Sequence, residues 1–263
     1  MTITWTHEPP HTELPEGFLY VGQDNFYVGP RNSEWPRCIY SDSATSCIIL
    51  ILEGYGRDKQ PLIALTHLSC AERFWAFSDI ADQHFQGPVA LFALGANPPG
   101  ADSSKHNSRL LLDWIHRHQP RRHAEIPRTS AWYFEQTTLA LGFRVPEKER
   151  SGCAGIDAQT GIVSTQAYAL TDAQRDSTGG VQTLFSIFGL MLDPPLVLHD
   201  ATQDFSSEEI EELIHAAKDA HWENIMQMDA GQIPNLFSST PDDELPWFSD
   251  TIRASAEYVM GET

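Results

Sequence analysis

Two apolar runs joined by a polar connection form the clearest hydrophobic pattern of the chain. The runs CIILILE and PLIALTH flank the loop GYGRDKQ, which contains two glycines and charged residues. This pattern is typical of a β-hairpin with a longer connection. Pairing symmetric about Arg57 predicts Cys47 opposite His67 and Ile49 opposite Leu65, with opposed Cβ atoms roughly 4.5 to 5.5 Å apart. A slip of one residue would send the two side chains to opposite faces.

Shorter patterns on both sides of this hairpin predict further strands. Aromatic and β-branched residues bounded by glycine and proline are typical of β-structure. On this basis we expect strands at 17–21, 25–29, 87–95 and 131–143, and a hairpin within 153–170 that turns at 159–161.

Helical spacing of apolar residues and capping signatures predict the helices. Ser69 with Glu72 resembles a capping box ahead of the first helix, and Ser207 precedes an acidic first turn in the helix expected at 205–222. Two more helices are expected at 104–119 and 247–260. Together these elements predict a mixed sheet with helices packed on it.

Composition narrows the class of protein. With 263 residues, of which 41% are hydrophobic, the chain can bury a substantial core. We expect an extended lead-in at 1–16 and a single domain at 17–263. A net charge of -19 argues against a nucleic-acid partner, because such affinity depends on clustered Lys and Arg.

Cysteine usage and the N-terminal segment predict the compartment. The four cysteines are too few and too dispersed for a disulfide framework. The first residues lack the basic and apolar regions of a Sec-type signal, and the run CIILIL is far shorter than a membrane span. We therefore expect a cytoplasmic protein without membrane association, although an effector exported by a dedicated machine would look the same.

Cys47 and His67 would form a nucleophile and its base if they meet. The thiolate is the nucleophile, and an adjacent imidazolium lowers a cysteine pKa below its free value of about 8.5. Such a pair normally needs a third group that fixes the imidazole tautomer. Ser41 and Thr45 share alternation parity with Cys47, so a strand extended backwards would direct both to its side. The alternative is that Cys47 is a small buried hydrophobe.

The segment SDSATSC followed by an apolar strand, a polar loop and LTH resembles the active-site region of the protein N-terminal asparagine amidohydrolase family. That family converts the side-chain amide of an N-terminal Asn to Asp and releases ammonia. Family-like segments follow in the same order, namely GFLYVGQ ahead of the motif and then GPVALFALG, AGIDAQTGIV and FSDTIRASAEYVM. The Cys-then-His order also resembles wider Cys-His deamidases, such as the chemoreceptor glutamine deamidase and the cytotoxic necrotizing factor catalytic domain. The resemblance implies an α+β fold with mixed or antiparallel, sandwich-like sheets flanked by helices.

The resemblance also implies roles for individual residues. Cys47 would be the nucleophile, His67 the acid and base, and Ser41 the group that orients the imidazole. Backbone N–H groups near Ser46 and Cys47 would stabilise the oxyanion.

Substrate binding is assigned by the same resemblance to Asp42, Thr45 and Ser46. The carboxylate of Asp42 is the candidate for holding an α-ammonium, and its alternative role is to cap a turn. Glu53 shares the parity of Cys47 but lies at the far end of its strand, which makes it a poorer choice. The implied partner is a peptide or protein with a free N-terminus, as in an N-degron, and no organic cofactor or metal is implied.

Other interpretations stay open at this point. The enzyme would instead deamidate an internal Gln or Asn of a target protein, or a small amide metabolite. A zinc set of Cys38, Cys47, His67 and Cys70 has suitable ligands, but its spacing matches no structural zinc motif. A non-catalytic protein would use the basic segment 105–123 as its interface, although the pattern there favours a helix with cations in its last turn.

Overall fold

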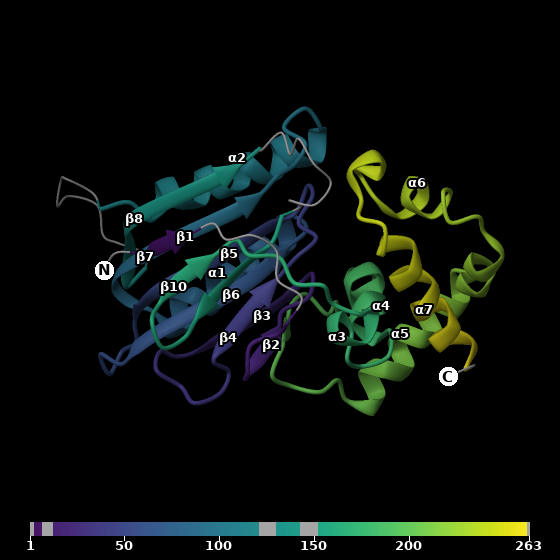
Figure 1. Cartoon of the computed structure of the whole chain (residues 1–263), viewed down its shortest axis with the longest axis horizontal. Helices are drawn as coiled ribbons and strands as arrows, with labels where there is room; N and C mark the ends of the chain where they lie inside the picture. The colour runs from purple at the N-terminus through teal and green to yellow at the C-terminus, as the bar shows by residue number, and fades with distance from the viewer. Residues whose placement is uncertain (1–2, 7–12, 121–129, 143–151, 262–263) are drawn as a thin grey trace.

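The computed structural model describes residues 3–6, 13–120, 130–142 and 152–261. Figure 1 shows two sheets face to face in one half of the molecule and a group of helices in the other half. The chain is therefore α+β, with two mixed sheets flanked by helices. None of the helices in these ranges is both long and apolar enough to cross a membrane.

The smaller sheet has the strand order β1-β10-β9-β4-β2. Its strands β1 and β10 are parallel, as are β2 and β4, whereas β9 pairs antiparallel with both of its neighbours. The segment expected to be an extended lead-in contributes β1 to this sheet. The bounds are Thr4–Thr6 for β1, Phe18–Tyr20 for β2, Cys38–Ser41 for β4, Ala154–Asp157 for β9 and Ile162–Ser164 for β10.

The larger sheet has the order β11-β3-β6-β5-β7-β8. Its central strands are buried on both faces, which explains their nearly continuous apolar sequences. The bounds are Asn25–Pro30 for β3, Ile48–Tyr55 for β5, Pro61–Leu68 for β6, Gln86–Gly95 for β7, Trp132–Leu141 for β8 and His199–Asp200 for β11.

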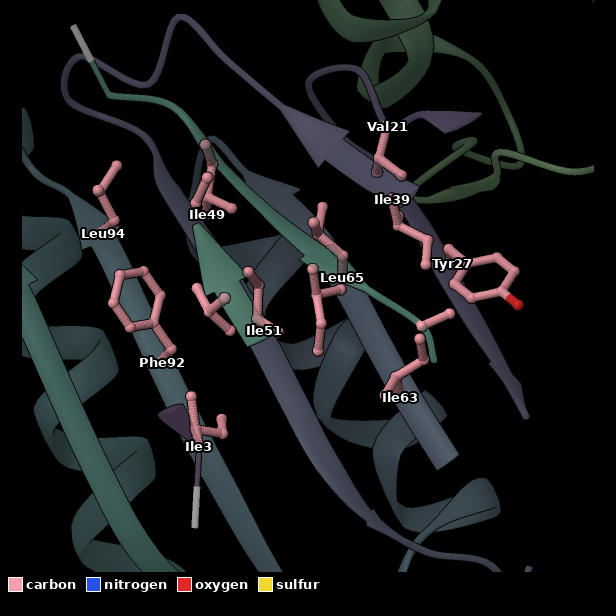
Figure 2. Close-up of a cluster of buried hydrophobic side chains, with 14 of the residues drawn as sticks. Ile3, Val21, Tyr27, Ile39, Ile49, Ile51, Ile63, Leu65, Phe92 and Leu94 are labelled. Atoms are coloured by element: carbon pink, nitrogen blue, oxygen red, sulfur yellow. The ribbon is translucent and has the colours of Figure 1, made fainter. Parts of the chain in front are cut away.

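Each face of the larger sheet covers a separate apolar core. Ile49, Ile51 and Leu65 point toward the smaller sheet and meet Ile39, as Figure 2 shows. The intervening residues point to the other face, where the helices α1 (Ala71–His84) and α2 (Asp102–Arg117) cover them. Successive strand residues alternate between faces, so one strand supplies both cores.

The second half of the molecule is a helical unit with its own apolar cluster. Arg73 of α1 joins this unit to the sheets, because its guanidinium lies 5.3 Å from the centroid of the Phe185 ring and donates to the Leu196 carbonyl. The bounds are Asp172–Arg175 for α3, Val181–Phe188 for α4, Ser207–Asp219 for α5, Ile233–Phe237 for α6 and Phe248–Met260 for α7, with 3-10 helices η2 (Gly189–Met191), η3 (Trp222–Gln227) and η4 (Pro241–Asp243).

The predicted strands and helices are present, but two predicted caps are wrong. Cys70 rather than Ser69 precedes α1, because the Ser69 hydroxyl donates to the carboxylate of Asp24 instead. The cap of α5 is Ser206, one residue before the predicted Ser207, and it forms a capping box with Glu209.

The predicted register of the central hairpin is wrong by two residues. Ile49, not Cys47, lies opposite His67. The loop is closed by a hydrogen bond from the N–H of Gly56 to the carbonyl of Gln60, which centres the hairpin on Asp58 rather than on Arg57. A shift of two residues preserves the faces, so Cys47 and His67 still share one side of the sheet but lie diagonally.

Candidate active site

Three residues of the predicted site gather at one end of the space between the two sheets. His67 is near the end of β6, and Cys47 immediately precedes β5. Ser41 ends β4 in the opposite sheet and lies on the same side of that strand as Ile39, which faces the core. Cys47 is 8% exposed, His67 2% and Ser41 0%, so the group is enclosed.

A hydrogen bond between the sheets orients the imidazole. The Oγ of Ser41 lies 3.0 Å from the Nδ1 of His67, whereas the Nε2 atom is buried without a hydrogen-bond partner. The carbonyl of His67 accepts a hydrogen bond of 2.7 Å from the N–H of Asp24, which fixes the backbone. If Nδ1–H donates to Ser41, the lone pair of Nε2 is open and the ring is a base.

Cys47 and His67 do not form a hydrogen bond in this conformation. The diagonal relation places Cβ atoms of such residues roughly 7 Å apart, against roughly 5 Å for directly opposed ones. The expected direct opposition is therefore replaced by a diagonal arrangement in which the two residues share one face of the sheet.

Burial keeps both groups neutral at rest. It raises the pKa of the Cys47 thiol well above its usual range, and the negative charges of Asp24 and Glu244 raise this pKa further. Burial also lowers the pKa of His67 to about 3. The site thus holds a thiol and a neutral imidazole, not the thiolate and imidazolium expected from the sequence.

Close backbone contacts hold the segment that carries Cys47. The carbonyl of Cys47 accepts from the N–H of Ala96, and that of Thr45 accepts from the N–H of Asn97. Gly95 has φ +131, and a Cβ there would lie 2.1 Å from the Cys47 carbonyl oxygen. Glycine is therefore required at this position for β7 to approach the backbone of Cys47.

The carboxylate of Asp42 already forms an ion pair with an arginine. Its carboxylate accepts from both the Nε and Nη2 atoms of Arg175, at 3.3 and 3.2 Å, and from the hydroxyls of Tyr20 and Ser43. The Arg175 guanidinium lies 4.2 Å from the centroid of the Trp247 ring. An α-ammonium would have to compete with this buried pair, and Asp42 is therefore a weak acceptor for one.

Thr45 and Ser46 contact the far end of the chain. We call residues 238–247 the strap, because this segment connects α6 to α7 and lies against the residues before Cys47. Thr45 Oγ1 donates to Glu244 at 3.3 Å, Ser46 and Ser239 share a hydrogen bond of 2.9 Å, and Trp247 Nε1 lies 3.3 Å from Ser43 Oγ. The strap brings a carboxylate, Glu244, to the site.

Glu244 is not among the site residues that the sequence predicts. It lies in the segment TPDDELPW, in which five acidic or proline residues suggest a solvated loop. Only the fold places this carboxylate beside the cysteine segment, 199 residues away in the chain.

The alternative interpretations concerned a zinc site and the basic segment 105–123. In the described ranges no cluster of three or more His, Cys, Asp or Glu residues could hold a metal ion. Within the basic segment, His118 is buried and stacked on Trp132 at 4.2 Å, and Lys105 pairs with Asp102. Residues 121–123 lie outside the described part of the chain.

No protein-family model matches the chain, and no curated protein is matched by it. The function is therefore inferred from the site and from the motif resemblance described above.

Proposed function

We propose that the chain is a thiol-dependent amide hydrolase that converts the side-chain amide of an N-terminal Asn to Asp and releases ammonia. The observation that supports this most is the hydrogen bond between Ser41 Oγ and His67 Nδ1, which joins the two sheets and leaves Nε2 open on the face of Cys47. Cys47 is the nucleophile and His67 acts as both acid and base. Ser41 is the positioning residue.

The neutral resting state suits the first step of this reaction. As the sulfur of Cys47 bonds to the carboxamide carbon, its proton passes to Nε2 of His67, and the carbonyl becomes a tetrahedral oxyanion. His67 then returns the proton to the amide nitrogen, and the C–N bond breaks to give ammonia and a thioester. Because the imidazole is neutral before the attack, no deprotonation is needed to make it a base.

Hydrolysis of the thioester uses the same histidine. His67 takes a proton from water as the water oxygen attacks the thioester carbon. The C–S bond breaks, Cys47 regains its proton, and the product is the Asp carboxylate. The net reaction consumes one water for each ammonia released.

The oxyanion would be stabilised by backbone N–H groups of the cysteine segment. Among the loop hydrogen bonds of the described residues, none uses the N–H of Ser46 or of Cys47 as a donor. Preorganised backbone donors of this kind stabilise the developing charge without reorganisation.

The experiment that tests the proposal is ammonia release with mass spectrometry of the product. The panel holds an Asn-initiated peptide, its Gln-initiated and N-acetylated versions, an internal-Asn peptide and free asparagine. We expect release from the free N-terminal Asn peptide alone, abolished by Cys47→Ala. The matched control is Cys38→Ala, because Cys38 is also a free, largely covered thiol but lies on β4 away from His67.

The other outcomes separate the chemistry from the substrate. Release from free asparagine or from internal amides that depends on Cys47 would retain the thiol mechanism and replace the substrate by a metabolite or a target protein. Release that survives Cys47→Ala, or no release from any member of the panel, would refute the proposed function.

A further inference from the structure

Glu244 differs from the carboxylates that are buried in or beside the sheets, because those carboxylates pair with an arginine. Asp24 pairs with Arg73, Asp42 with Arg175 and Glu53 with Arg31. Within the described ranges, Glu244 forms no ion pair and accepts only from the hydroxyls of Ser238 and Thr45. A partly buried carboxylate without a counter-charge is electrostatically prepared to receive a cation.

Glu244 lines a pocket of about 150 Å³ at the junction of the sheets and the helical unit. The pocket also contains the carboxylate of Asp176 and the carboxamide of Gln182, whose Oε1 atom is buried without a hydrogen-bond partner. Its only cation among the described lining residues is Arg175, which Asp42 neutralises. The pocket therefore has an excess of negative charge and of acceptors.

Four of the described residues that line this pocket are aromatic, namely Tyr20, Phe237, Trp247 and Phe248. Aromatic faces attract ammonium groups and also accommodate an apolar side chain. The volume of about 150 Å³ admits a single side chain rather than a large ligand.

Glu244 also lies next to the nucleophile segment. Its carboxylate accepts from Thr45, two residues before Cys47, and its charge contributes to the raised pKa of the Cys47 thiol. Cys47 and His67 are not among the described residues that line the pocket, whereas Glu244 both lines it and contacts Thr45 of the cysteine segment.

We propose that Glu244 binds the α-ammonium of the residue whose side-chain amide is attacked by Cys47, and that the pocket beside Glu244 receives the following side chain. In an N-terminal Asn only two carbons separate the ammonium nitrogen from the carboxamide carbon, so the acceptor must lie close to the nucleophile. The inference rests on the proposed function for the role of Cys47. It assigns the selection of a free N-terminus to the strap, not to Asp42.

The test measures binding by calorimetry, so that it does not depend on turnover. The probes are a five-residue peptide that begins Asn-Leu with a free N-terminus and its N-acetylated twin, each titrated into the Cys47→Ala protein. A charge-assisted hydrogen bond to Glu244 predicts that the free peptide binds about tenfold tighter or more. Glu244→Gln keeps the shape and an acceptor oxygen, and should bring this ratio close to one.

Two further variants serve as controls. Asp243→Asn removes an exposed carboxylate from the adjacent position and should leave the ratio unchanged. The double variant Asp42→Asn with Arg175→Gln removes both charges of the ion pair and should also leave the ratio unchanged, whereas loss of the ratio in that variant would return the role to Asp42 and overturn the proposal. Circular dichroism of each variant checks that it is folded.

Other results of the binding experiment would refute the role of Glu244. The inference is refuted if the Cys47→Ala protein binds both peptides equally or binds neither. It is also refuted if the ratio of the two affinities is unchanged by Glu244→Gln. Failure of the proposed function has a different signature, which is absent or Cys47-independent ammonia release from the wild-type protein while the binding ratio persists.

Discussion

Replacing Ser41 by alanine would remove the hydroxyl that contacts Nδ1 of His67 at 3.0 Å. Ser41 and His67 are almost completely buried, so water cannot replace the lost partner at little cost. Leaving a buried polar group without its partner costs about 1 to 3 kcal/mol of folding free energy. We therefore expect Ser41→Ala to lower the free energy of unfolding by about that amount.

The catalytic effect follows from the charge that His67 acquires during the reaction. When Nε2 takes the thiol proton, the ring becomes cationic, and a hydrogen bond from Nδ1–H to Ser41 is then charge-assisted. Losing about 1.4 to 2.8 kcal/mol of transition-state stabilisation lowers kcat about ten- to a hundredfold. Because Ser41 positions the base and does not hold the substrate, KM should change little.

The assay combines urea denaturation with the kinetics of ammonia release. The matched control is Ser104→Ala, because Ser104 is equally buried but its Oγ has no hydrogen-bond partner, and its loss should not cost this energy. A double-mutant cycle with His67→Ala should give a coupling of about 1 kcal/mol. An unchanged kcat, or a coupling of zero, would refute the assignment of Ser41 as the positioning residue.

Two further predictions concern the pH dependence and the backbone of the site. Burial lowers the pKa of His67 from 6.5 to about 3, so as the pH falls the unfolded chain binds a proton at His67 before the folded chain does. The free energy of unfolding is therefore highest above pH 6.5 and decreases as the pH falls toward 3. Urea titrations from pH 4 to 7 should show this slope, up to about 1.4 kcal/mol per pH unit, reduced in His67→Gln, and equal slopes would contradict it. Gly95→Ala should abolish ammonia release and lower the Tm more than Gly87→Ala, because both glycines have positive φ but a Cβ clashes only at Gly95, with the carbonyl of Cys47. Equal Tm shifts in thermal denaturation would show that the clash is relieved elsewhere.

The sequence predicts the faces of the strands better than their register. Alternation has a period of two, so Cys47 and His67 stay on one face even though their pairing is wrong by two residues. The register itself depends on how the loop closes. The hydrogen bond from Gly56 to Gln60 and the positive φ of Lys59 decide it, and neither is visible in the apolar pattern.

Partners that are distant in the chain account for what the sequence could not predict. The alternation parity of Ser41 indicated its side of the strand, and the family resemblance is the source of the role that we propose for it. Nothing in the local pattern connects Asp42 to Arg175, which lies 133 residues further along. The same holds for Thr45 and Glu244, because such contacts depend on how the helical unit packs against the sheets.

The strap also has a consequence for the order in which the parts of the chain are synthesised. The two ends of the hydrogen bond from Thr45 to Glu244 are 199 residues apart. At roughly 5 to 20 residues per second, a ribosome delivers Glu244 about 10 to 40 s after Thr45. Throughout that interval the nascent chain carries the proposed nucleophile without the carboxylate that we assign to substrate selection. Synthesis of the strap, rather than formation of the sandwich, would thus be the event that completes the proposed site.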